Sequence, residues 1–133
     1  MVATSSAELK FEKTIANLLR ARFPYLYIST WEESRVLSLI SSVATNNELI
    51  RTARKVFEWS LTDGLADSGK SIGEDTKSAL KALEFIERCQ EPAIFVLKDF
   101  HVFFGANNRP QDIQVIRKIR DLLPNLKQSQ SPK

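Results

Sequence analysis

The stretch Pro92 to Phe104, PAIFVLKDFHVFF, contains the longest apolar run of the chain and decides how the rest is interpreted. Five consecutive apolar residues, Ala93 to Leu97, follow a proline and precede Lys98 and Asp99. A strand exposed on one face would alternate apolar and polar residues, so this unbroken run predicts a strand covered on both faces, as in a parallel sheet. Ligands of such α/β proteins bind at the carboxyl ends of the strands. Asp99 is therefore a candidate site residue, and the alternative is that it only caps a turn before a core segment.

The composition is that of an ordinary globular domain. The chain has 133 residues, of which 43% are hydrophobic and 26% charged, so it can form one domain with a real core and is not membrane-spanning. The single cysteine, Cys89, cannot form an internal disulfide, and the N-terminal residues lack the apolar core of a signal peptide. We therefore expect a cytoplasmic protein. One histidine and one cysteine make no zinc-ligand cluster, and we expect no bound metal. A net charge of +3, spread along the chain, argues against nucleic acid as a partner.

Helical and extended patterns alternate along the chain on both sides of the central strand. Apolar residues at helical spacing predict helices over residues 5–23, 31–44, 48–54, 76–89 and 110–123. Aromatic and β-branched residues predict strands over residues 25–29, 56–61 and 93–97. Ser5 and Glu8 have the spacing of a capping box at the start of the first helix. Residues 62–75 are expected to form one long polar loop.

Alternating strands and helices at this spacing predict β-α-β units. We expect an α/β domain in which helices flank a small, mostly parallel sheet of about three strands. Residues 1–128 form this domain, and residues 129–133 form a polar, mobile C-terminal tail. No internal repeat or low-complexity segment indicates a second domain.

A phosphate-loop motif lies within the predicted polar loop. Residues 64–71, GLADSGKS, match GxxxxGK[ST], in which backbone N–H groups surround phosphates, the lysine reaches the terminal phosphates and the hydroxyl binds Mg²⁺. In this interpretation the protein binds ATP with Mg²⁺. The candidate cofactor-binding residues are then Gly64, Gly69, Lys70, Ser71 and Asp99.

The residues around the motif argue against phosphate binding. A working phosphate loop passes directly into a helix whose N-terminus points at the phosphates. Here Gly73 interrupts that first turn, and the carboxylates of Glu74 and Asp75 would repel phosphate. These residues favour a simple connecting loop, with no cofactor bound and no catalytic residue.

Four segments of the chain resemble one family of ATPases. In this order, LLRARFPYLYISTWEESRVL (18–37), VFEWSLTDGL (56–65), PAIFVLKDFHVFF (92–104) and VIRKIRDLLPNLKQS (115–129) are similar to the AAA-type ATPases of cyanobacteria and algal plastids. Those proteins carry a divergent domain ahead of a standard AAA module. The resemblance implies a degenerate, AAA-like domain with the three-layer fold of the P-loop NTPases, which has lost its nucleotide chemistry. Nothing in this sequence corresponds to the AAA module itself.

The resemblance also implies where a phosphate loop would lie. In the AAA fold this loop follows the first core strand, here residues 25–29, and the next residues are TWEE (30–33), without glycine or lysine. Glu32 and Glu33 place two carboxylates at a helix N-terminus, where a phosphate would otherwise bind. The family's Asp-Glu pair falls on the third strand. There Asp99 either takes the place of the magnesium-binding acid, followed by Phe100, or takes the place of the catalytic glutamate, with Lys98 in the magnesium position. Both departures imply that the domain does not hydrolyse ATP.

Two functional classes remain open at this stage. The first is a non-catalytic AAA-like domain that binds a protein, either an AAA module or another copy of itself. The second is a small ATP-binding protein that uses residues 64–71. A further strand is expected after helix 110–123, but the final residues QSPK are too short and polar to supply it. We therefore expect an open sheet edge that a partner covers, most simply by self-association.

Overall fold

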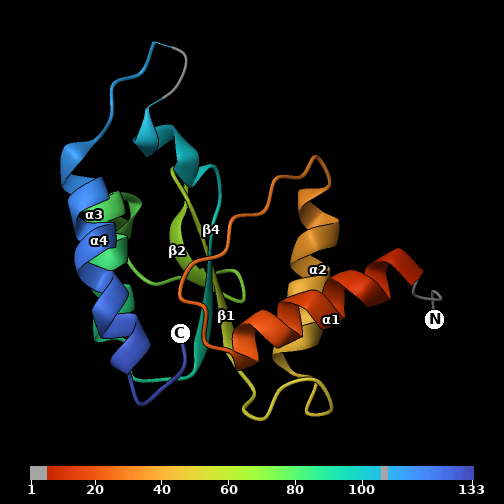
Figure 1. Ribbon diagram of the computed structural model, residues 1–133. Helices are drawn as coiled ribbons and strands as arrows, with labels where there is room; N and C mark the ends of the chain where they lie inside the picture. Colours follow the sequence, from red (N-terminus) through yellow and green to blue (C-terminus); the bar gives the residue numbers. More distant parts are fainter. Residues whose placement is uncertain (1–5, 106–107) are drawn as a thin grey trace.

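A four-stranded mixed sheet forms the centre of the computed structural model, which describes residues 6–105 and 108–133 (Figure 1). The strand order is β3-β2-β1-β4, with β1 at Lys55–Ser60, β2 at Gly64–Asp67, β3 at Lys70–Ser71 and β4 at Ala93–Leu97. Only β1 and β4 are parallel, whereas β2 is antiparallel to both of its neighbours. The α/β class is confirmed. The sheet itself differs from the prediction, because two of its three pairings are antiparallel and a fourth strand is present.

Helices cover both faces of the sheet, as the three-layer prediction requires. Helices α1 (Ser6–Arg20) and α2 (Glu33–Ala44) lie on one face, and α3 (Ala79–Arg88) and α4 (Ile113–Gln128) lie on the other (Figure 1). Two short 3-10 helices, η1 (Glu74–Lys77) and η2 (Phe100–Phe104), precede α3 and follow β4. Ser5, the predicted cap of the first helix, lies outside the described residues. Within the part of the chain that the structure describes, each helix is too short or too polar to cross a bilayer.

The two faces have separate apolar clusters. The larger one lies between the sheet and α3 and α4, with the fully buried Trp59 of β1 at its centre. The Nε1 of Trp59 donates a hydrogen bond to the backbone oxygen of Thr76 at 2.6 Å, and the ring of Phe100 packs edge-on against it at 5.5 Å. The smaller cluster lies between α1 and α2. Side chains along β1 alternate between the two faces of the sheet. Phe57 and Trp59, two residues apart, therefore both point toward α3 and join the larger cluster.

Residues 64–71 form a β-hairpin, so the prediction of a long polar loop is wrong. Asp67 pairs with Lys70, which leaves Ser68 and Gly69 as a two-residue turn. Both turn residues have positive φ, +52° and +84°, as in the type I′ turns that suit the twist of a hairpin. Residues 48–54, predicted as a short helical piece, form a turn and a bend instead of a helix.

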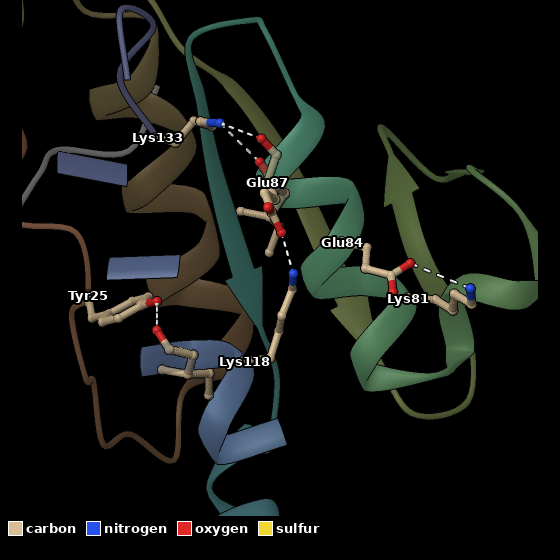
Figure 2. A network of polar contacts seen from close by, with 8 residues as sticks. Tyr25, Lys81, Glu84, Glu87, Lys118 and Lys133 are labelled. Carbon is tan, nitrogen blue, oxygen red and sulfur yellow. Dashed lines mark hydrogen bonds and ion pairs between the residues drawn. The ribbon is translucent and has the colours of Figure 1, made fainter. Parts of the chain in front are cut away.

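Residues 24–30 are extended but form no strand, so the predicted strand at residues 25–29 is also wrong. No backbone hydrogen bond joins this segment to the sheet. It runs beside the outer edge of β4 (Figure 1), and the hydroxyl of Tyr25 holds it by donating to the backbone oxygen of Ile119 in α4 at 2.6 Å (Figure 2). Aromatic and β-branched residues favour a strand only where a neighbouring backbone lies about 4.8 Å away.

The C-terminal residues 129–133 pack against the domain, contrary to the prediction of a mobile tail. The Nζ of Lys133 donates to the backbone oxygen of Glu87 at 3.3 Å (Figure 2). It also donates to the backbone oxygens of Ile86 and Cys89, at 3.1 and 2.9 Å. These carbonyls lie at the C-terminal end of α3, where a cation interacts favourably with the helix dipole. Helix α4 also continues through Pro124 to Gln128, because burial of Leu126 holds its last turn in place.

Candidate functional site

The carboxyl ends of the two parallel strands meet the N-terminus of α2. Lys98 follows β4, and its Nζ lies 3.1 Å from the Oε1 of Glu58 in β1 and 3.4 Å from the Oε1 of Glu33 in α2. The hydrogen bond to Glu58 is the largest cause of a raised pKa of Lys98, although partial burial opposes it. Lys98 is therefore a fixed positive charge at neutral pH that ties α2 to both strands.

The other acid at this helix end also has a basic partner. Arg35 contacts the Oε2 of Glu32 at 3.0 Å through Nη1 and the Oε1 of Glu8 in α1 at 2.8 Å through Nε. The N-terminus of α2 is where the resemblance places a phosphate, and here side-chain carboxylates with their own cations lie at that position. A phosphate arriving there would meet negative charge at short range.

Asp99 follows these parallel strands but has an exposed side chain. Its backbone adopts the left-handed conformation with φ 55° and ψ 26°, which aspartate tolerates better than most residues. Its backbone oxygen accepts from the N–H of Val102 at 3.3 Å and so starts η2. The side chain makes no capping hydrogen bond. The backbone of Asp99 thus forms the turn that precedes η2.

The structure separates Asp99 from the other residues of the phosphate-loop motif. Lys70 and Ser71 lie exposed in β3, next to Gly69 in the turn. Strands β3 and β4 are the two opposite edges of the sheet, so three strand spacings, roughly 14 Å, separate Lys70 from Asp99 across the sheet. The backbone of residues 64–71 also takes part in sheet pairing, and the motif leads into a 3-10 turn, not an α-helix.

Gly64, the first residue of the motif, has a packing role. Its φ is +71°, and a Cβ built on it would lie 2.7 Å from the Oγ1 of Thr76 and 3.0 Å from the backbone nitrogen of Lys77. The same Oγ1 accepts from the N–H of Leu65 at 2.9 Å. Gly64 therefore allows η1 to approach the hairpin closely, which places Thr76 beneath Trp59.

The sequence analysis missed an exposed apolar surface on the segment between α1 and α2. We call it the 23–31 surface, and its exposed large apolar residues are Phe23, Tyr25, Leu26, Tyr27 and Trp31. Tyr27 is 75% exposed, and Trp31 is exposed completely. The density of aromatic residues between Phe23 and Trp31 could have indicated an exposed binding surface. The same aromatic and β-branched composition is typical of a core strand, and the segment was predicted as one. Among the described residues, no group of three His, Cys, Asp or Glu side chains could hold a metal ion.

Comparison with known proteins agrees with this architecture. A family model described as "SpoVK-like AAA ATPase, N-terminal domain" matches residues 11–133. The "Uncharacterized AAA domain-containing protein ycf46" of Guillardia theta is 36% identical over 90% of this chain and 22% of its own length. The proteins of that name from Trieres chinensis and Gracilaria tenuistipitata var. liui are 35% and 33% identical over 90% and 92% of this chain.

The chain spans less than a quarter of the length of these relatives, at 22 to 23%. No solved structure matches it. The family match covers nearly the whole chain, and the relatives include plastid proteins with an AAA domain, so the resemblance found in the sequence is confirmed. This chain belongs to the family of SpoVK-like AAA ATPase N-terminal domains.

Proposed function

We propose that this domain acts in protein assembly and not in catalysis, by binding an ATPase module or another copy of itself. The 23–31 surface is the observation that carries the proposal. Exposed aromatic residues are concentrated on this short segment, and tyrosine and tryptophan are enriched among the residues that dominate binding energy at interfaces. The complete exposure of Trp31 leaves a large apolar area that a partner would remove from water.

The 23–31 surface is held in place before any partner binds. Tyr25 donates to the backbone oxygen of Ile119, and Arg22 donates to the backbone oxygen of Ser129 at 2.9 Å, so both contacts tie the segment to the C-terminal part of the chain. A preorganised segment loses less conformational freedom on binding than a free loop does. The surface is therefore suited to a specific interface.

The site at the strand ends supports the non-catalytic part of the proposal. Glu33 and Lys98 form an ion pair at the end of α2, and Asp99 lacks a neighbouring glutamate to activate water. Phosphoryl transfer depends on cations and backbone N–H groups around the phosphates. Here the cations Lys98 and Arg35 are already paired with carboxylates of the chain itself.

Association measured across a concentration series tests the proposal. Sedimentation velocity of the 133-residue chain, alone and mixed with the AAA module of the Guillardia theta relative, should show a complex in at least one case. Tyr27→Ser and Trp31→Ser should weaken it, whereas Ile113→Ser should not. Ile113 is the matched control because it is 76% exposed, like Tyr27, but lies at the start of α4. A single monomer mass in all mixtures at high micromolar concentration would contradict the proposal.

A further inference from the structure

The 23–31 surface has charges of opposite sign at its two ends. Figure 1 shows the segment leaving the end of α1 and reaching the start of α2 at the other end of β4. Arg20 and Arg22 form a basic end beside α1, and Glu32 and Glu33 form an acidic end beside α2. At roughly 3.3 Å per residue, the extended residues 24–30 separate these ends by roughly 20 Å, which is more than a Debye length at physiological salt. Each end therefore presents its own charge to a partner.

The arginines of the basic end bond to neutral groups. Arg20 donates to the side-chain oxygen of Asn17, and Arg22 donates to the backbone oxygen of Ser129 at 2.9 Å. A third guanidinium lies nearby, because burial and then the charge of Arg22 lower the pKa of Arg54. Neither Arg20 nor Arg22 forms an ion pair with a carboxylate in the part of the chain that the structure describes. The positive charge at this end is therefore open to an anionic group of a partner.

The acidic end keeps a negative charge although both of its glutamates have basic neighbours. Arg35 is shared between Glu32 and Glu8, and Lys98 is shared between Glu33 and a second carboxylate. Each cation thus contacts two anions. The side chain of Glu32 is also 64% exposed, so a guanidinium from outside the chain can reach it.

The residues between the charged ends are arranged symmetrically about Tyr27. Tyr27 is the midpoint between Arg22 and Glu32, and also between Phe23 and Trp31. Phe23, Tyr27 and Trp31 are the most exposed large apolar residues of the surface, at 54%, 75% and complete exposure. A second copy lying antiparallel, with Tyr27 opposite its own Tyr27, would place Arg22 opposite Glu32 and Phe23 opposite Trp31. The surface is therefore complementary to itself in this one orientation.

We infer that the 23–31 surface binds a second copy of this domain, antiparallel across a two-fold axis at Tyr27. The inference rests on the proposed function and names which of its two partners occupies the surface. A two-fold interface makes each contact twice, so it contains two Arg22–Glu32 ion pairs and two Phe23–Trp31 contacts. A parallel alignment would place like charges opposite each other at both ends, which opposes binding.

The size of the surface indicates a weak dimer. Full burial of an aromatic side chain removes roughly 150–250 Å² from water. The exposed fractions of Phe23, Tyr27 and Trp31 then give on the order of 700–1,100 Å² over both copies. Interfaces below about 1,200 Å² belong mostly to transient complexes. We therefore expect association in the micromolar range, in which the charged ends fix the orientation of the two copies.

Reversal of the charge at each end tests this inference. Sedimentation velocity across a concentration series gives the dissociation constant of the 133-residue chain. Arg22→Glu and Glu32→Arg should each raise this constant by a factor on the order of 10, because each places like charges together at both ends of the dimer. Lys70→Glu is the matched control, because it makes the same charge change as Arg22→Glu on the exposed strand β3, at the opposite edge of the sheet. It should leave the dissociation constant unchanged.

An equimolar mixture of the two variants separates pairing of the ends from damage to the fold. In the mixed dimer, unlike charges lie opposite each other at both ends. The mixture should therefore dimerise about as tightly as the unaltered chain, although neither variant does so alone. A single chain that carries both Arg22→Glu and Glu32→Arg should regain the homodimer for the same reason.

The possible failures distinguish this inference from the proposed function. Unchanged dissociation constants in Arg22→Glu and Glu32→Arg would overturn the inference, as would a mixture that associates no more tightly than its components. A chain that stays monomeric at high micromolar concentration but binds the AAA module would also overturn it, and the proposed function would stand. The absence of association with either partner would contradict both.

Discussion

Replacing Gly64 by alanine should destabilise the domain strongly, although the added group is one methyl. The φ of +71° costs a residue with a Cβ about 1–2 kcal/mol. The Cβ would also lie 2.7 Å from the Oγ1 of Thr76, so Thr76 must move and its hydrogen bond with Leu65, worth about 1 kcal/mol, is weakened. The total is about 2–3 kcal/mol, or a fall in Tm of roughly 10 °C for a domain of this size.

Gly69 provides the matched control for this substitution. It has a similar φ of +84°, but nothing lies within 4 Å of a Cβ built on it. Gly69→Ala should therefore cost only the conformational term of about 1–2 kcal/mol. Urea unfolding followed through the fluorescence of the buried Trp59 measures both variants. Equal destabilisation by the two substitutions would refute the packing role of Gly64, as would a failure of Thr76→Ala to reduce the cost in a double-mutant cycle.

Three further perturbations test other parts of the structure. Burial raises the pKa of Tyr25 from 10.0 to about 12, so the folded state keeps the phenol proton longer and stability should fall as pH rises from about 10 to 12. Tyr25→Phe should reduce this loss of stability at high pH. Below pH 9 it should lower the free energy of unfolding by about 1 kcal/mol, because it removes the hydrogen bond to Ile119. An equally steep loss of stability above pH 10 in the variant would contradict this. Lys70→Ala should change the free energy of unfolding by less than about 0.5 kcal/mol. ATP with Mg²⁺ should not raise Tm, whereas a true ligand at a hundred times its Kd would add about 2.7 kcal/mol to the free energy of unfolding. Lys133→Ala should lower stability by about 0.5–1 kcal/mol through loss of the cation at the end of α3, and amide exchange in the last turn of α3 would show where the loss occurs.

Local patterns in the sequence predicted most of the helices and the two central strands. Helices α2 and α3 and strands β1 and β4 all lie within a few residues of their predicted positions, because their apolar spacing matches the faces they bury. Residues 25–29 have equally strong strand propensity, but a strand also requires a neighbour, and propensity does not supply one.

The hairpin at residues 64–71 was missed for a different reason. The motif GxxxxGK[ST] drew attention to phosphate chemistry, while the Ser68-Gly69 dipeptide between short strands was the better signal for a tight turn. The contacts of the tail were invisible in the sequence, because Lys133 and Pro132 bond to backbone atoms more than 35 residues away. Polar composition alone predicted mobility there, whereas the carbonyls at the end of α3 provide a specific site for the lysine.

The ion pairs of Lys98 hold the N-terminal end of α2 without a ligand. In nucleotide-driven switches, a phosphate and its metal hold a loop or helix end, and that end is released when the phosphate leaves. Here the groups that hold the end of α2 are Glu33, Glu58 and Lys98, which are covalently part of the chain and cannot dissociate from it. These partly exposed ion pairs contribute roughly 0–1 kcal/mol each, and they form without any bound ligand.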